Sequence, residues 1–62
     1  MKKWWNVDKT NSDEEYLYID LEGIGTIQIK KESEGIVVDI YPLQVADEPV
    51  ASTYALYNEL IG

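Results

Sequence analysis

Residues 16–41 read YLYIDLEGIGTIQIKKESEGIVVDIY, in which isoleucine, valine, leucine and tyrosine alternate with polar residues and are interrupted by glycines. Such alternation is typical of antiparallel strands joined by tight turns. It predicts three strands, at about residues 15–21, 24–31 and 36–41. Residues 4–6 are a candidate fourth strand, which a polar loop at residues 8–15 separates from the others.

The first turn determines which side chains share a face of the sheet, because a one-residue slip exchanges the two faces. A three-residue loop at residues 21–23, with Gly23 in the left-handed conformation, aligns Leu17 and Ile19 with the isoleucines of the second strand. A two-residue turn at residues 22–23 would instead set Tyr16 and Tyr18 beside those isoleucines. The odd-length loop is the favoured interpretation.

The second turn extends this register to the third strand. A four-residue loop at residues 32–35, ending on a left-handed glycine, sets Ile29 opposite Val38. One face of the sheet is then apolar, and it comprises Leu17, Ile19, Ile27, Ile29, Ile36, Val38 and Ile40. The opposite face is mainly polar and aromatic, and it comprises Tyr16, Tyr18, Asp20, Thr26, Gln28, Lys30, Val37, Asp39 and Tyr41.

The C-terminal segment has helix signals at both ends, with Asp47 as the N-cap, Pro49 in the first turn and Gly62 past the end. The expected helix would cover the apolar face with a stripe that comprises Val50, Tyr54, Tyr57 and Ile61. The alternative is a fifth strand at residues 51–56, where β-formers are dense. The predicted fold class is α+β, a small antiparallel β-meander of three to four strands with one C-terminal helix on one face. The alternative class is all-β.

Length and composition predict a single domain over residues 1–62, since the chain has room for one core and 45% of its residues are hydrophobic. It has no cysteine, so neither disulfides nor thiolate-bound zinc support that core. Twelve acidic residues against five lysines give a net charge of −7. A body of this charge repels nucleic acid and anionic membranes and attracts basic protein surfaces.

Most familiar catalytic sites are excluded, because the chain lacks both histidine and cysteine to activate a nucleophile. Asp20 and Asp39 share a face, but so small a sheet offers no cleft that would desolvate a carboxylate pair. The loop at residues 8–15 fails as a calcium site, since Asp13 stands where an EF-hand needs glycine. The sequence therefore predicts no enzyme, no cofactor and no bound metal.

The N-terminus places Lys2 and Lys3 before Trp4 and Trp5, an arrangement that some single-strand nucleic-acid binders use. From residue 10 onward, however, two lysines stand against eleven carboxylates, which predicts no direct nucleic-acid binding. No secretory signal or run of eighteen apolar residues is present, so we expect a cytoplasmic protein without a membrane segment.

The candidate binding site is the polar face of the sheet, because tyrosine provides a large contact area at low entropic cost. The alternative is that tyrosine stands there only for its β-propensity. An acidic cluster in the preceding loop is expected to steer an approaching partner. The face residues are Tyr16, Tyr18, Asp20, Asp39 and Tyr41, and the cluster residues are Asp13, Glu14 and Glu15.

Two functions follow as hypotheses. The first is a small acidic protein-binding module that docks on a basic protein surface. In its sharpest form it is a nucleic-acid-mimicking inhibitor that occludes the basic surface of a nuclease or other nucleic-acid-binding protein, by analogy with phage anti-defence proteins. The second is a self-associating or accessory subunit that pairs with a copy of itself or with a larger chain.

Overall fold

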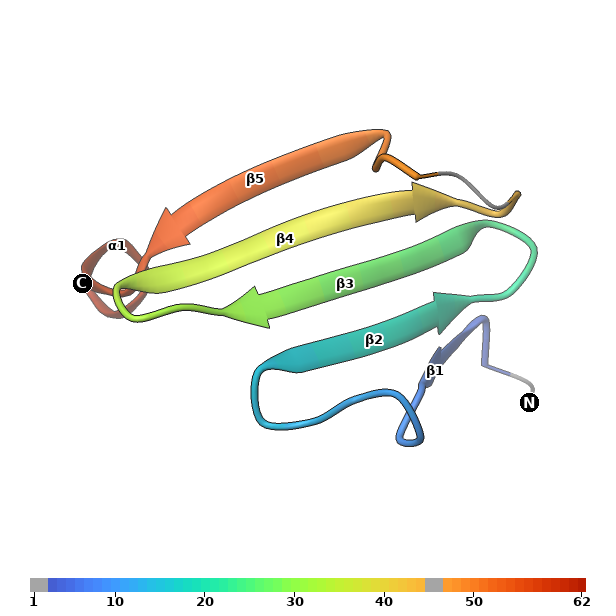
Figure 1. Cartoon of the computed structure of the whole chain (residues 1–62), viewed down its shortest axis with the longest axis horizontal. Coiled ribbons are helices and arrows are strands. Elements are labelled where there is room, and N and C mark those ends of the chain that lie inside the picture. Colours follow the sequence, from blue (N-terminus) through green and yellow to red (C-terminus); the bar gives the residue numbers. More distant parts are fainter. Residues whose placement is uncertain (1–2, 45–46) are drawn as a thin grey trace.

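The computed structural model describes residues 3–44 and 47–62 (Figure 1). It contains one antiparallel sheet of five strands in the order β1-β2-β3-β4-β5, so each strand pairs with the next along the chain. The strands are followed by one short helix, and their bounds are β1 Trp5–Val7, β2 Tyr16–Leu21, β3 Gly25–Lys31, β4 Gly35–Pro42, β5 Ala51–Leu56 and α1 Tyr57–Ile61. The predicted meander is confirmed, with more strands and a shorter helix than expected.

The first hairpin has the predicted odd-length loop, displaced by one residue. It spans residues 22–24, and Gly23 has a φ of 71°, the left-handed conformation that the turn requires. Leu17 lies opposite Ile29 and Ile19 lies opposite Ile27. Moving the loop by one residue shifts each cross-strand pair by two positions, so the assignment of side chains to faces is unchanged.

The second hairpin has the predicted register, since Lys31 pairs with Ile36 and Ile29 pairs with Val38. The prediction of a left-handed Gly35 is wrong, because Gly35 does not have a positive φ. Glycine is required there for space: a Cβ on Gly35 would overlap the carbonyl oxygen of Ala55 on β5. The close approach of β5 thus explains a glycine that the sequence had assigned to the turn.

The predicted helix over the C-terminal segment is wrong for most of its length. Residues 51–56 form β5, the alternative interpretation, and only residues 57–61 are helical. Asp47 lies outside the helix, so it is not an N-cap, whereas Gly62 does follow the last turn with a φ of 93°. Pairing with the open edge of β4 satisfies backbone groups along six residues, which outweighs the local helix signals.

The sheet has no second layer within the described residues. Helix α1 packs against β5, and Figure 1 shows it at the end of the sheet where β5 ends. None of the hydrophobic side chains in residues 3–44 and 47–62 is buried. The same part of the chain contains no helix with the length and apolar character needed to cross a membrane.

The five-strand register extends both predicted faces. The apolar face comprises Trp5, Val7, Leu17, Ile19, Leu21, Ile27, Ile29, Lys31, Ile36, Val38, Ile40, Ala51, Thr53 and Ala55, of which Lys31 and Thr53 are the polar members. The tyrosine face comprises Asn6, Tyr16, Tyr18, Asp20, Thr26, Gln28, Lys30, Val37, Asp39, Tyr41, Ser52, Tyr54 and Leu56.

Candidate functional site

The tyrosine face is organised in rows that run across the strands. Tyr18 of β2 lies opposite Gln28 of β3, which lies opposite Asp39 of β4. In the next row Asp20 lies opposite Thr26, and Thr26 lies opposite Tyr41. The five predicted face residues therefore share one side of the sheet, with β3 between the two groups.

The aromatic part of this face is ordered by contacts between neighbouring side chains. The rings of Tyr16 and Tyr18 are stacked, with centroids 6.1 Å apart and an angle of 14° between their planes. The Lys30 ammonium lies 5.8 Å from the centroid of Tyr16, within the range of a cation–π contact. Lys30 also pairs with Glu32 at 3.7 Å, so its charge is partly balanced.

The two carboxylates of the face have different surroundings. Asp39 accepts a hydrogen bond from the hydroxyl of Ser52, which comes from β5. Asp20 is exposed and pairs across the ladder with Thr26. Asp20 and Asp39 belong to different rows of the sheet, so they do not form a carboxylate pair. Each can accept a charge-assisted hydrogen bond from a cationic group.

Tyr54 belongs to this face as well, although the helix signals in the sequence predict it on a helical stripe. It lies on β5 opposite Val37 and is 47% exposed. Desolvation raises the pKa of its phenol, and the Glu32 and Glu34 carboxylates raise it further. The alternative interpretation of residues 51–56 as a strand would have found it, because Tyr54 then points to the same side as Ser52.

The polar loop at residues 8–15 is held by its own side chains. Asp8 accepts hydrogen bonds from the backbone nitrogens of Thr10 and Asn11 at 3.1 and 3.2 Å and from Asn11 Nδ2 at 2.7 Å. Ser12 Oγ accepts a hydrogen bond from the Tyr18 backbone nitrogen at 2.9 Å, which ties the loop to β2. The pKa of Asp8 is lowered, chiefly by the side-chain hydrogen bond from Asn11.

Asp13 has a structural role in addition to its charge. Its Oδ1 accepts hydrogen bonds from the backbone nitrogens of Glu15 at 2.8 Å and Tyr16 at 2.9 Å. These two bonds lower the pKa of the Asp13 carboxyl, because they favour its charged form. Asp13 therefore fixes the entry into β2, immediately before the first tyrosine of the face.

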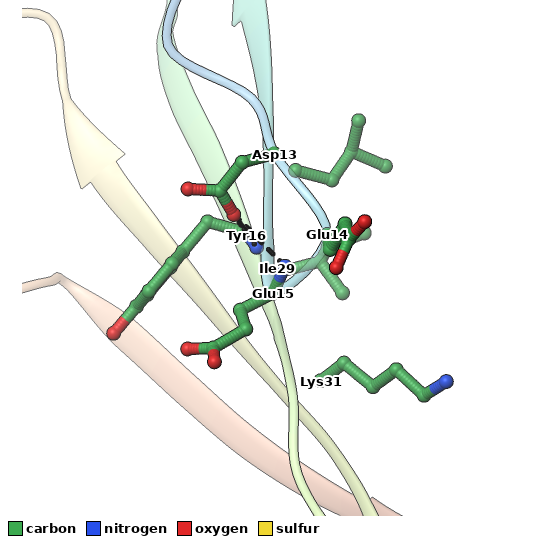
Figure 2. A pocket seen from close by; sticks show the side chains of 7 residues that line it. Asp13, Glu14, Glu15, Tyr16, Ile29 and Lys31 are labelled. Carbon is green, nitrogen blue, oxygen red and sulfur yellow. Dashed lines mark hydrogen bonds between the residues drawn. The ribbon is translucent and has the colours of Figure 1, made fainter.

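A shallow pocket of about 110 Å³ lies where this loop meets the sheet (Figure 2). In Figure 2 the carboxylates of Asp13 and Glu15 point to the side of the Tyr16 ring, whereas Glu14 and Lys31 point to the other side. The acidic cluster is thus divided between the two sides of the sheet. The pocket is lined by Asp13, Glu14, Glu15, Tyr16, Leu17, Ile29 and Lys31.

The described residues bring together no group of three or more acidic, histidine or cysteine side chains that could hold a metal ion. Comparison of the chain with protein-family models, with curated proteins and with solved structures finds no match. The functional interpretation therefore rests on the two faces of the sheet and on the acidic loop.

Proposed function

We propose that this chain is a small acidic protein-binding module whose tyrosine face docks on a basic surface of another protein. The observation that carries the proposal is the stacked pair of Tyr16 and Tyr18 on an uncovered sheet face that also presents carboxylates. Rigid aromatic side chains are the usual anchors of protein interfaces, because little conformational entropy is lost when they are fixed.

Charge supports a basic partner. The chain has a net charge of −7, and Lys30, the lysine within the tyrosine face, is paired with Glu32. Asp20 and Asp39 lie on the same face as the tyrosines. Asp13 and Glu15 of the acidic cluster point to this side, whereas Glu14 points to the other. These carboxylates would accelerate the approach of a cationic surface and suppress binding to acidic ones.

The sharper form of the proposal is mimicry of nucleic acid, with carboxylates taking the place of phosphates in the basic groove of a nuclease or another nucleic-acid-binding protein. The feature that favours it is that Asp39 is held by a hydrogen bond from Ser52 on a rigid sheet. A fixed anion loses less entropy on binding than a flexible one. A cytoplasmic setting fits this role, since such partners act there.

The proposal is tested by capture of partners from a lysate of the source organism on the immobilised chain, followed by mass spectrometry. Basic nucleic-acid-binding proteins should be captured at low salt and released as salt rises, because a charge-driven complex weakens with screening. A matched column of Tyr18→Ala should capture them less well, whereas Glu48→Gln, which removes one charge outside the sheet, should differ little. The proposal would be contradicted if the amount of captured protein changed neither with the salt concentration nor with the Tyr18→Ala substitution.

A further inference from the structure

The apolar face is the largest unexplained feature of the molecule. Its central side chains, Ile27, Ile29 and Val38, are only half-buried, and Trp5, Leu17 and Ile40 are 41%, 37% and 39% exposed. Protein domains are built from at least two packed layers, because an apolar sheet face must be removed from water. We propose that a second copy of this chain covers the face, so that two five-stranded sheets form a sandwich.

The exposed surface area supports a second copy quantitatively. The chain exposes 5104 Å², whereas a compact monomer of 7.1 kDa is expected to expose about 4,100 Å². The excess of roughly 1,000 Å² is close to the ~800 Å² that each partner buries in a standard stable interface. The radius of gyration of 12.7 Å likewise exceeds the ~10.6 Å expected for 62 residues.

The charge pattern of the face permits two copies to meet despite their net charge. The strand positions of the apolar face carry no carboxylate; the charged residues on this side are Lys31, at the end of β3, and Glu14, in the loop before β2. The carboxylates of the strands, Asp20 and Asp39, lie on the tyrosine face. A symmetric contact between two apolar faces would therefore bury aliphatic side chains without burying an acidic one.

The described residues offer little to cover this face. Helix α1 has five residues and packs against the edge strand β5. A basic partner is also a poor occupant, since the strand positions of this face carry no acidic group to pair with it. A sandwich would leave both tyrosine faces outward, so the dimer would present two copies of the binding surface.

Sedimentation equilibrium of the full chain at concentrations from about 1 to 500 μM tests the proposal directly. We expect a mass approaching twice 7.1 kDa as concentration rises. Added salt should leave the dimer intact or strengthen it, because salt screens the repulsion between two acidic chains. A mass that remains monomeric for a folded chain over the whole range would overturn the proposal.

A matched pair of variants identifies the face involved. Ile27→Lys places a charge in the middle of the apolar face, and Gln28→Lys places the same charge at the next position, on the tyrosine face. Both variants lower the net negative charge equally. Ile27→Lys should raise the dissociation constant of the dimer by more than about tenfold, and Gln28→Lys should not. The reverse result, or equal effects, would contradict a sandwich through the apolar face.

Should Ile27→Lys fail to fold, the unmodified chain still decides the matter. If folding is coupled to dimerisation, the denaturant midpoint of the unmodified chain must rise with protein concentration. A midpoint independent of concentration, together with a monomeric mass, would overturn the proposal. If Ile27→Lys does fold and still associates as tightly as the unmodified chain, the proposal is also overturned. The copies would then join elsewhere, for example through the open edge of β5, which does not involve Ile27.

Discussion

Ile29 and Val38 lie directly opposite each other in the ladder between β3 and β4, at the centre of the apolar face, and both are only half-buried. In a two-layered domain such a pair would belong to the core. Here the described residues provide nothing to lie over it, so its contribution to stability depends on what covers the sheet.

Ile29→Ala should destabilise the protein strongly and should also weaken dimerisation. Truncation of a buried isoleucine to alanine costs about 2–5 kcal/mol, which is a large share of a small domain's stability. The free energy of unfolding, measured by denaturant titration at high protein concentration, checks this prediction. Tyr18→Ala, on the opposite face, is the control and should cost less. An unchanged unfolding free energy for Ile29→Ala would show that the apolar face stays in water.

Asp13 should stabilise the entry into β2 above the ordinary aspartate pKa of 3.8 and lose this effect in acid. Its pKa is lowered in the folded chain, so the folded state binds its proton less readily than the unfolded state does. The stabilisation is therefore complete above pH 3.8 and disappears as the pH falls through the lower, folded pKa. NMR titration of the Asp13 carboxyl, with the denatured chain as the reference, measures the shift.

Two substitutions separate the hydrogen bonds of Asp13 from its charge. Asp13→Asn retains an oxygen that accepts from the backbone nitrogens of Glu15 and Tyr16, whereas Asp13→Ala removes it. Asp13→Ala should therefore speed amide exchange at Tyr16 more than Asp13→Asn does. Equal exchange rates in the two variants would mean that the carboxylate does not hold this turn.

The isolated chain should bind neither DNA nor RNA at physiological salt. Beyond residue 9 two lysines stand against eleven carboxylates, and phosphate contacts would have to come from Lys2 and Lys3. A mobility-shift assay with single-stranded and double-stranded probes checks the expectation. A shift at low micromolar protein that disappears in Lys2→Glu/Lys3→Glu would favour stacking of bases on the neighbouring tryptophans and oppose mimicry.

Binding to a captured basic partner should separate anchors from steering charges. Tyr18→Ala should increase the dissociation rate, because a central aromatic anchor is lost. Neutralisation of Asp13, Glu14 and Glu15 together should mainly slow association, and the effect should shrink at high salt. For this test Asp13 is replaced by asparagine, which retains its turn. Surface plasmon resonance measures the two rates separately. The assigned roles would be contradicted if Tyr18→Ala mainly slowed association and neutralisation of the cluster mainly sped dissociation.

The faces of the sheet could be predicted from the sequence because alternation has a period of two. The first turn lies one residue later than expected, yet Leu17 and Ile19 still face the isoleucines of β3. Any odd-length loop gives this result, so the prediction did not depend on locating the turn. The tyrosines of β2 and β4 were placed on their common face for the same reason.

The C-terminal segment could not be predicted from local signals. Asp47 and Pro49 favour a helix start, but the open edge of β4 is a tertiary feature that no short window of sequence contains. The error removed Tyr54 from the candidate site and supplied a covering helix that the structure lacks. The structural role of Asp13 was missed because its hydrogen bonds depend on the path of the loop into β2.

The central claim is that the two faces of this sheet have different roles, and thiol labelling tests it most directly. The chain has no cysteine, and β4 offers neighbouring valines on opposite faces, Val37 on the tyrosine face and Val38 on the apolar face. Single variants Val37→Cys and Val38→Cys would be alkylated under reducing conditions at low and high protein concentration. We predict that the Val38→Cys thiol reacts about tenfold more slowly once nine-tenths of the chains are paired, while the Val37→Cys thiol keeps its rate. Protection of Val37→Cys with Val38→Cys unaffected would contradict the account, because the tyrosine face would then be the surface that joins the copies.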